Sequence, residues 1–114
     1  MMNVETISER LIALGDAVRT ARDAVLADDA ASTELSQAVR DLAEQHREAK
    51  NRSRQVEPRI ARELVHLLEA VAFRAKHEAE ETDGIGESTR QAVREAHEAA
   101  AKLAEEVEAP AWRT

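Results

Sequence analysis

The chain has 114 residues, a length that accommodates one domain with a modest core. It contains no cysteine, which excludes disulfides, thiolate chemistry and cysteine-ligated metal sites. The formal net charge is −7, so binding to the phosphate backbone of a nucleic acid would require a segregated basic patch. Alanine is abundant and the strong helix breakers are only three glycines and two prolines, a composition typical of helices.

The first expected helix covers residues 4–27, where apolar side chains recur at spacings of three and four. Such a seam is typical of helices packed nearly parallel to one another in a bundle. Thr6 and Glu9 have the spacing of a capping box, which predicts the start of this helix. The seam consists of Val4, Ile7, Leu11, Leu14, Val18, Ala21 and Val25.

The second expected helix covers residues 33–55, with Ser32 or Thr33 as its N-cap. Pro58 cannot continue a preceding helix but suits the first turn of a new one, which favours a tight turn before it. The alternative is one kinked helix over about residues 33–81, which would need a partner chain to cover it. The seam of this segment consists of Leu35, Val39, Leu42, His46, Ala49, Ser53 and Val56.

The third expected helix covers residues 58–81 and has the broadest apolar face, so we expect it to be the most buried. That face includes Leu67 and Leu68. Two glycines within residues 82–87 predict a loop. The run from Ser88 to Gln91 then has the pattern of a capping box before a fourth helix over residues 88–108. Residues 110–114 are expected to form a flexible tail.

Four segments of similar length with short connections predict an all-α, antiparallel up-down-up-down four-helix bundle. We expect it to form a single domain over residues 1–109. No stretch approaches the roughly 20 apolar residues of a membrane span. The first residues also lack a basic segment followed by an apolar run. We therefore expect a cytoplasmic protein that does not interact with membranes.

Glu63 and His66 form a Glu-x-x-His step, which ferritin-like di-iron bundles use twice on facing helices. A ferritin-like metal-binding bundle is therefore one alternative function. Here the step occurs once, and His66 is expected to point away from the apolar face of its helix. Nucleophile–base sets and phosphate-binding glycine loops are not recognisable. The sequence thus predicts a protein that is not an enzyme, with no catalytic residue, metal ligand or cofactor.

His46 lies in the middle of the second seam, unlike the other histidines. The favoured interpretation is a core histidine with one hydrogen-bond partner. The alternative is a buried group that must take up a proton in acid, so that stability falls as the pH drops through about 6.5.

Basic residues gather where the second and third helices meet, and acidic residues gather at the opposite end of the expected bundle. This basic end predicts a site for an anion, an acidic protein partner or, as a further alternative, nucleic acid. The competing interpretation is a solvated helix end neutralised by Glu105, Glu106 and Glu108. The basic end consists of Arg47, Lys50, Arg52, Arg54, Arg59 and Arg62.

A second candidate surface is the back of the third helix, where His66, Ala70, Phe73 and His77 share a stripe. Phe73 is one of two aromatic residues in the chain, so we consider a homodimer through this stripe. Together, the two surfaces predict a non-enzymatic protein–protein interaction, scaffold or regulatory module.

The stripe hypothesis predicts that Phe73→Ser lowers the sedimenting mass from a dimer to a monomer, because it removes the apolar centre of the seam. Analytical ultracentrifugation of the variant and the parent protein measures this directly. Equal masses for the two proteins would exclude the Phe73 stripe as a dimer interface.

Overall fold

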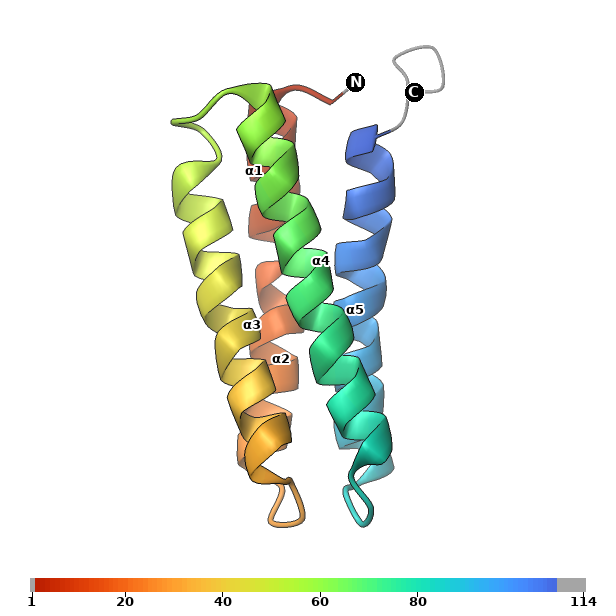
Figure 1. Cartoon of the computed structure of the whole chain (residues 1–114). Coiled ribbons are helices and arrows are strands. Elements are labelled where there is room, and N and C mark those ends of the chain that lie inside the picture. The colour runs from red at the N-terminus through yellow and green to blue at the C-terminus, as the bar shows by residue number, and fades with distance from the viewer. Residues whose placement is uncertain (1, 109–114) are drawn as a thin grey trace.

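The structure, a computed structural model, describes residues 2–108, which form four antiparallel helical rods (Figure 1). The first rod contains α1 (Val4–Ala13) and α2 (Gly15–Leu26). The other rods are α3 (Thr33–Arg52), α4 (Pro58–Glu81) and α5 (Glu87–Glu108). The described residues contain no strand, and the all-α four-helix bundle is confirmed. The predicted tail at residues 110–114 lies outside the described residues.

Each rod packs against two neighbours: α2 against α3 and α5, and α4 against α3 and α5. The shorter α1 contacts α3 and α4. The loops that follow α2 and α4 lie at one end of the bundle (Figure 1). The first residues of the chain and the loop between α3 and α4 lie at the other end.

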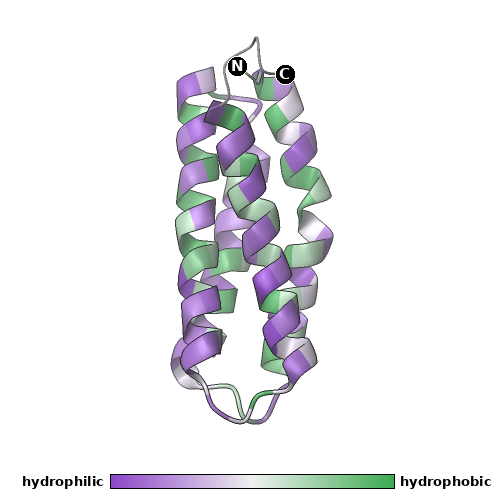
Figure 2. Cartoon of the chain, turned by 90° about the vertical axis from the view of Figure 1, so that its right-hand side faces the viewer, coloured by the Kyte–Doolittle hydropathy of each residue, from purple (hydrophilic) through white to green (hydrophobic). Residues whose placement is uncertain are grey.

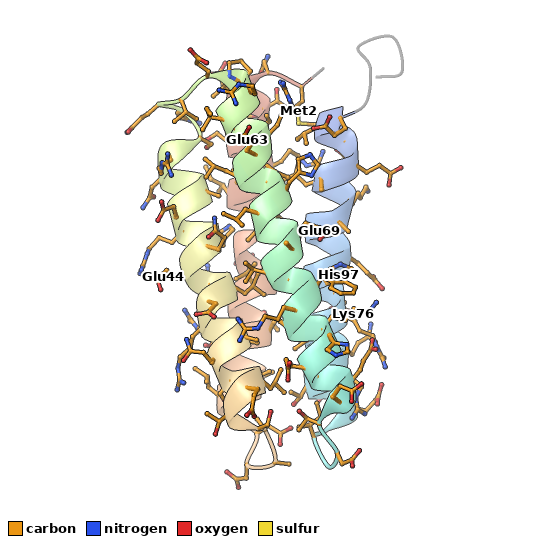
Figure 3. The ribbon with its side chains drawn as sticks, in the orientation of Figure 1. Met2, Glu44, Glu63, Glu69, Lys76 and His97 are labelled. Carbon is orange, nitrogen blue, oxygen red and sulfur yellow. The ribbon has the colours of Figure 1, made fainter. Side chains whose placement is uncertain are left out.

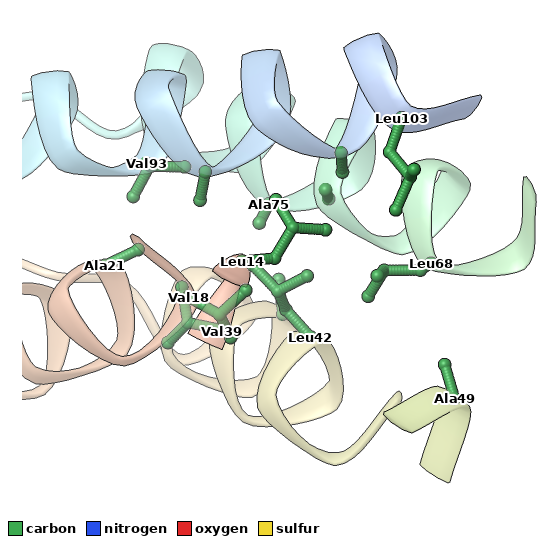
Figure 4. Close-up of a cluster of buried hydrophobic side chains, with 14 of the residues drawn as sticks. Leu14, Val18, Ala21, Val39, Leu42, Ala49, Leu68, Ala75, Val93 and Leu103 are labelled. Carbon is green, nitrogen blue, oxygen red and sulfur yellow. The ribbon is translucent and has the colours of Figure 1, made fainter. Parts of the chain in front are cut away.

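The core consists of narrow stripes of leucine, valine and alanine that all four rods contribute (Figure 4). Apolar and polar residues alternate along every ribbon with the helical period, as Figure 2 shows. Many core positions are fully buried alanines, including Ala21, Ala38 and Ala72. Because alanine is small, the stripes allow the helices to approach one another closely.

Leu67 is an exception to the predicted core, because its side chain is 51% exposed. The neighbours of α4 cover the stripe that contains Val65, Leu68 and Ala72, which are all fully buried. Leu67 lies about 100° around the helix from Leu68, beyond the covered stripe. The prediction that Leu67 is buried was wrong, since α4 has a broader apolar face than its neighbours can cover.

The start of the first helix also differs from the prediction. Asn3 is the N-cap of α1, and its side-chain oxygen accepts a hydrogen bond from the backbone N–H of Thr6 at 2.8 Å. The predicted capping box of Thr6 and Glu9 was wrong, because the helix already begins at Val4. Asparagine is among the most favourable residues at this position.

Two residues set the boundaries around α3 and α4. Ser32 caps α3, because its side-chain oxygen accepts a hydrogen bond from the backbone N–H of Leu35 at 3.0 Å. Of the two predicted N-cap residues, Ser32 and Thr33, the first is therefore confirmed. The chain leaves α3 after Arg52, and α4 starts at Pro58 behind an extended Glu57. The alternative of one kinked helix over residues 33–81 was therefore wrong. The second helix is also shorter than the predicted range of 33–55.

The first rod is interrupted at Leu14, whereas the sequence predicted one helix over residues 4–27. The backbone N–H of Leu14 bonds to the carbonyl of Arg10, and the N–H of Val18 bonds to the carbonyl of Leu14. Gly15 follows the interruption, and glycine has a low helix propensity. The apolar seam continues across the break, which is why periodicity alone did not reveal it.

Asp28 joins the two loops at one end of the bundle. Its Oδ2 atom accepts hydrogen bonds from the backbone N–H of Gly86 and the hydroxyl of Thr89, both at 2.9 Å. Its Oδ1 atom accepts one from the N–H of Ala30 at 3.0 Å. The predicted capping box from Ser88 to Gln91 was wrong, because α5 begins at Glu87 and the buried Thr89 bonds to Asp28 instead.

Hydrogen bonds from Gly86, which has the largest effect, and from Ala30 and Thr89 lower the pKa of Asp28 from its ordinary value of 3.8. A lowered folded-state pKa stabilises the fold above pH 3.8, and this stability is lost as the pH falls through 3.8 toward the folded-state pKa. We expect Asp28→Ala to lower the melting temperature at neutral pH and to flatten its decline in acid.

Circular dichroism melts between neutral pH and about pH 3 measure this effect. The matched control is Asp29→Ala, which removes an exposed carboxylate from the same loop. Equal losses of stability in the two variants would contradict the role assigned to Asp28.

Candidate functional site

A groove of about 460 Å³ lies between α2 and α3. These two helices pack side by side in the bundle (Figure 1). Two arginines of α2 and three basic residues of α3 line it, with Glu44 as the single acidic residue. The floor contains Ile12, Val18, Ala43 and the ring of His46. A protein with a net charge of −7 thus has a predominantly basic groove. The basic residues are Arg19, Arg22, Arg40, Arg47 and Lys50.

Three of these basic side chains form ion pairs on the rim of the groove. On α2, Nη1 of Arg19 lies 3.1 Å from Oδ1 of Asp16, and Nη2 of Arg22 lies 3.0 Å from Oδ1 of Asp23. On α3, Nη2 of Arg47 lies 3.8 Å from Oε1 of Glu44. These pairs reach into solvent, where an ion pair contributes about 0–1 kcal/mol and exchanges partners readily. They reduce the positive charge of the groove but leave the guanidinium groups available to a ligand.

Arg40 and Lys50 differ from the other three, because no carboxylate of residues 2–108 forms an ion pair with either. Both side chains are exposed. They lie ten residues apart on α3, which corresponds to about 15 Å along the helix axis. The uncompensated positive charge is therefore spread along the groove and not concentrated at one point.

His46 is buried in the floor of the groove, with 6% of its surface exposed. Its Nε2 atom lies 2.6 Å from the carbonyl oxygen of Leu11. Because a carbonyl only accepts, Nε2 carries the hydrogen and donates it. Leu11 belongs to the last turn of α1, where carbonyl groups lack partners within the helix. This buried ring with one partner confirms the interpretation of His46 as a core histidine.

The ring of His46 also lies directly against the backbone at the break in the first rod. A Cβ atom on Gly15 would be 3.4 Å from Cε1 of this ring. The imidazole thus connects α3 to the end of α1 and the start of α2. The same side chain that supports the break forms part of the groove floor.

Burial lowers the pKa of His46 from its ordinary value of 6.5, and this effect outweighs the hydrogen bond to Leu11, which raises it. The positive charges of Lys50 and Arg19 lower the pKa further. His46 is therefore neutral at neutral pH. Its neutral state avoids placing another positive charge beneath the basic rim.

The structure divides the predicted basic end into several groups. Arg47 and Lys50 line the groove. Arg52 pairs with Glu48 at 3.1 Å, and Arg59 pairs with Glu63 at 2.9 Å. The basic end is thus partly compensated by neighbouring carboxylates on its own helices.

The remaining two residues of the basic end turn toward other helices. The Nε atom of Arg54 donates to the hydroxyl of Ser8 at 3.0 Å. Arg62 lies 3.9 Å from Glu108, one of the acidic residues expected to neutralise this end. Glu106 instead forms a two-pronged ion pair with Arg10, which lowers the pKa of Glu106 and ties α5 to α1. Arg54 and Arg62 therefore support packing between rods.

Sequence reasoning missed Arg19, Arg22 and Arg40 as members of the basic surface. These residues belong to two helices, and only the antiparallel register of α2 and α3 brings them together. One signal was available, since Arg19 and Arg22, and likewise Arg40 and Arg47, have spacings that place them on one helix face. The signal was not decisive, because charged faces are also typical of ordinary solvent-exposed surfaces.

The predicted stripe on α4 lies along its border with α5. His66 is half exposed, and its Nε2 atom is 2.8 Å from Glu108. Phe73 is 54% exposed and meets the ring of His97 edge to face, with centroids 5.6 Å apart. Figure 3 shows His97 projecting from α5 beside α4. His77 is exposed further along the same helix, and the homodimer stays a prediction.

The residues of the Glu-x-x-His step do not converge on a common point. Glu63 pairs with Arg59 on the outer surface of α4 (Figure 3), whereas His66 turns toward Glu108 on α5. Within residues 2–108, no three histidine, aspartate or glutamate side chains form a group that could hold a metal ion. The described part of the chain thus offers no set of donors for the metal-binding alternative.

Comparisons with known proteins do not assign the chain to a family. No protein-family model matches it, and no curated protein or solved structure matches it significantly. None of the helices in residues 2–108 combines the length and apolar character needed to cross a membrane.

Because burial lowers the pKa of His46, the unfolded chain binds a proton on this residue more readily than the folded protein does. The stability it supports is complete above pH 6.5 and falls as the pH drops through 6.5 toward the folded-state pKa. We expect His46→Leu to flatten this decline. At neutral pH the variant should lose about 1 kcal/mol, because the Leu11 carbonyl loses its donor.

Urea unfolding of both proteins between about pH 7.5 and 5 measures the difference. His77→Gln is the matched control, because it removes an exposed histidine from α4. If His46→Leu keeps the pH profile of the parent protein, the buried histidine does not cause the loss of stability in acid.

Proposed function

We propose that this protein is a non-enzymatic protein–protein interaction module that binds an acidic segment of its partner in the α2–α3 groove. The observation that carries the proposal is the convergence of five basic side chains and one acidic side chain on a single groove. The positive electrostatic potential of these side chains attracts carboxylates and orients them as the partner approaches the groove.

The distribution of charge favours a protein partner over nucleic acid. The whole chain has a net charge of −7, which repels a long phosphate backbone at distances where the groove is only a small part of the surface. A short acidic segment of a protein is affected mainly by the local field, because charges separated by more than about 8 Å are screened at physiological ionic strength.

The non-enzymatic assignment rests on the chemistry of the side chains around the groove. Arginine and lysine bind anions, but a general base or nucleophile would need an accessible titrating group beside them. Two groups of the groove could act as a base: His46 is buried with 6% of its surface exposed, and Glu44 forms an ion pair with Arg47. This arrangement supports binding in preference to proton transfer.

The proposal predicts that the double variant Arg40→Glu/Lys50→Glu binds a short fluorescein-labelled poly-L-glutamate peptide about tenfold more weakly than the parent protein. The reversal removes two uncompensated positive charges and adds repulsion along the groove. Fluorescence anisotropy measures the affinity, and circular dichroism verifies that the fold is unchanged. Binding by the parent protein should weaken as salt is added.

The matched control is Arg52→Glu/Arg59→Glu, which changes the net charge equally at the predicted basic end. Both arginines lie outside the groove and pair with carboxylates of their own helices. We expect this control to weaken binding only slightly. Equal weakening in the two double variants would contradict a role for the groove and point to the overall charge. No binding by the parent protein would also refute the proposal.

A further inference from the structure

The α2–α3 groove combines charge with exposed apolar surface, and this combination restricts its partner further. Ile12 lines the groove and is 55% exposed, although it is a large aliphatic side chain in the middle of a helical rod. Ala43 is partly buried between the basic residues of α3. A simple anion such as phosphate would make no use of these apolar groups. The floor therefore favours a ligand that has both carboxylates and an apolar side.

The positions of the basic residues along the groove determine how far apart the negative charges of a matching ligand must be. The bond from His46 to Leu11 places the middle of α3 beside the end of α1, and the two rods run in opposite directions. In this register Ile12, the residue after Leu11, lies near the level of His46 and therefore between Arg40 and Arg47, whereas Arg19 and Arg22 lie toward the Arg40 end of the groove. Positive charge thus occurs toward both ends of the groove.

The spacing of Arg40 and Arg47 on α3 gives this separation most directly. Arg40 and Arg47 are seven residues apart, which corresponds to two helical turns and about 10 Å along the axis. Two carboxylates on a partner helix have the same separation when they are also seven residues apart. An apolar residue four positions after the first carboxylate lies on the same face of that helix, between the two charges. It would then lie over the apolar floor.

We infer that the groove binds an amphipathic acidic helix of a protein partner, with carboxylates at positions i and i+7 and an apolar residue at i+4. The partner packs as a fifth helix along α2 and α3, in the helix-in-groove mode of recognition. Its apolar residue covers Ala43 and Ile12, and its carboxylates meet the basic residues at the two ends. This inference rests on the proposed function and specifies the form of the acidic segment.

The test uses the full chain and two synthetic fluorescein-labelled peptides of identical composition. Both are alanine-based helices of three heptads with leucine at i+4. One has glutamates at i and i+7, and the other has its second glutamate at i+9, which rotates that carboxylate by about 200° to the opposite face. We expect the i, i+7 peptide to bind at least about fivefold more tightly in anisotropy titrations.

Ile12→Ser separates helix recognition from simple charge attraction. We expect this variant to weaken binding of the i, i+7 peptide about fivefold, because it removes apolar contact area, and to weaken binding of poly-L-glutamate by a clearly smaller factor. Ile12 is already half exposed, so its replacement preserves the core. Leu67→Ser is the matched control, because it removes a similarly exposed aliphatic side chain from α4, outside the groove.

The outcomes distinguish the inference from the proposed function. Equal affinities for the two helical peptides, or an Ile12→Ser variant that binds both as the parent does, would overturn the inference. Continued binding of poly-L-glutamate would then leave the proposed function intact. Tighter binding of a single-stranded DNA oligonucleotide or of inositol hexakisphosphate than of the i, i+7 peptide would also overturn it. If none of these anions binds, both proposals fail together.

Discussion

The structure depends on the close packing of four narrow stripes of small side chains. Alanine at positions such as Ala38, Ala72 and Ala100 leaves little bulk between the helices, so their backbones approach closely. Only the innermost stripe of each helix is then covered. Long polar side chains at the edges of neighbouring stripes meet across several contacts, such as Arg74 with Asp41 between α4 and α3 and Arg10 with Glu106 between α1 and α5. The α2–α3 groove arises in this way, since arginines at the edges of both helices face one another above a thin apolar floor.

The fold was predictable because each helix contains a continuous apolar seam and each connection contains a recognisable helix stop or start. Ser32 and Pro58 start helices as their chemistry requires. The break at Leu14 was not predictable in the same way, since the seam continues through it. The capping of α5 was also missed. Its partner, Asp28, is distant in sequence, and only the folded bundle brings the two loops together.

The candidate site was predicted only in part, and the reason is physical. A concentration of charge along the sequence identified Arg47 and Lys50, but the same criterion included Arg52 and Arg59, which pair with carboxylates one turn away. Arg19 and Arg22 join the site from α2 because of the register in which α2 packs against α3. This register cannot be read from a single sequence. The role of Ile12 was hidden for a related reason, because an aliphatic residue beside a seam is ordinarily part of the core.

The interruption of the first rod has a consequence for how the molecule moves. The rod is interrupted at Leu14, where helical hydrogen bonds still join α1 to α2, so an opening of α1 as its own cooperative unit bends the rod at this residue and exposes Ile7 and Leu11. The first helix is attached by the buried side chains of Ile7 and Leu11 and by three polar contacts, namely the Arg10–Glu106 pair, the Arg54–Ser8 bond and the His46–Leu11 bond. Amide hydrogens of residues 4–13 should therefore exchange with solvent through a smaller opening than those of α4, which has packed neighbours along both sides.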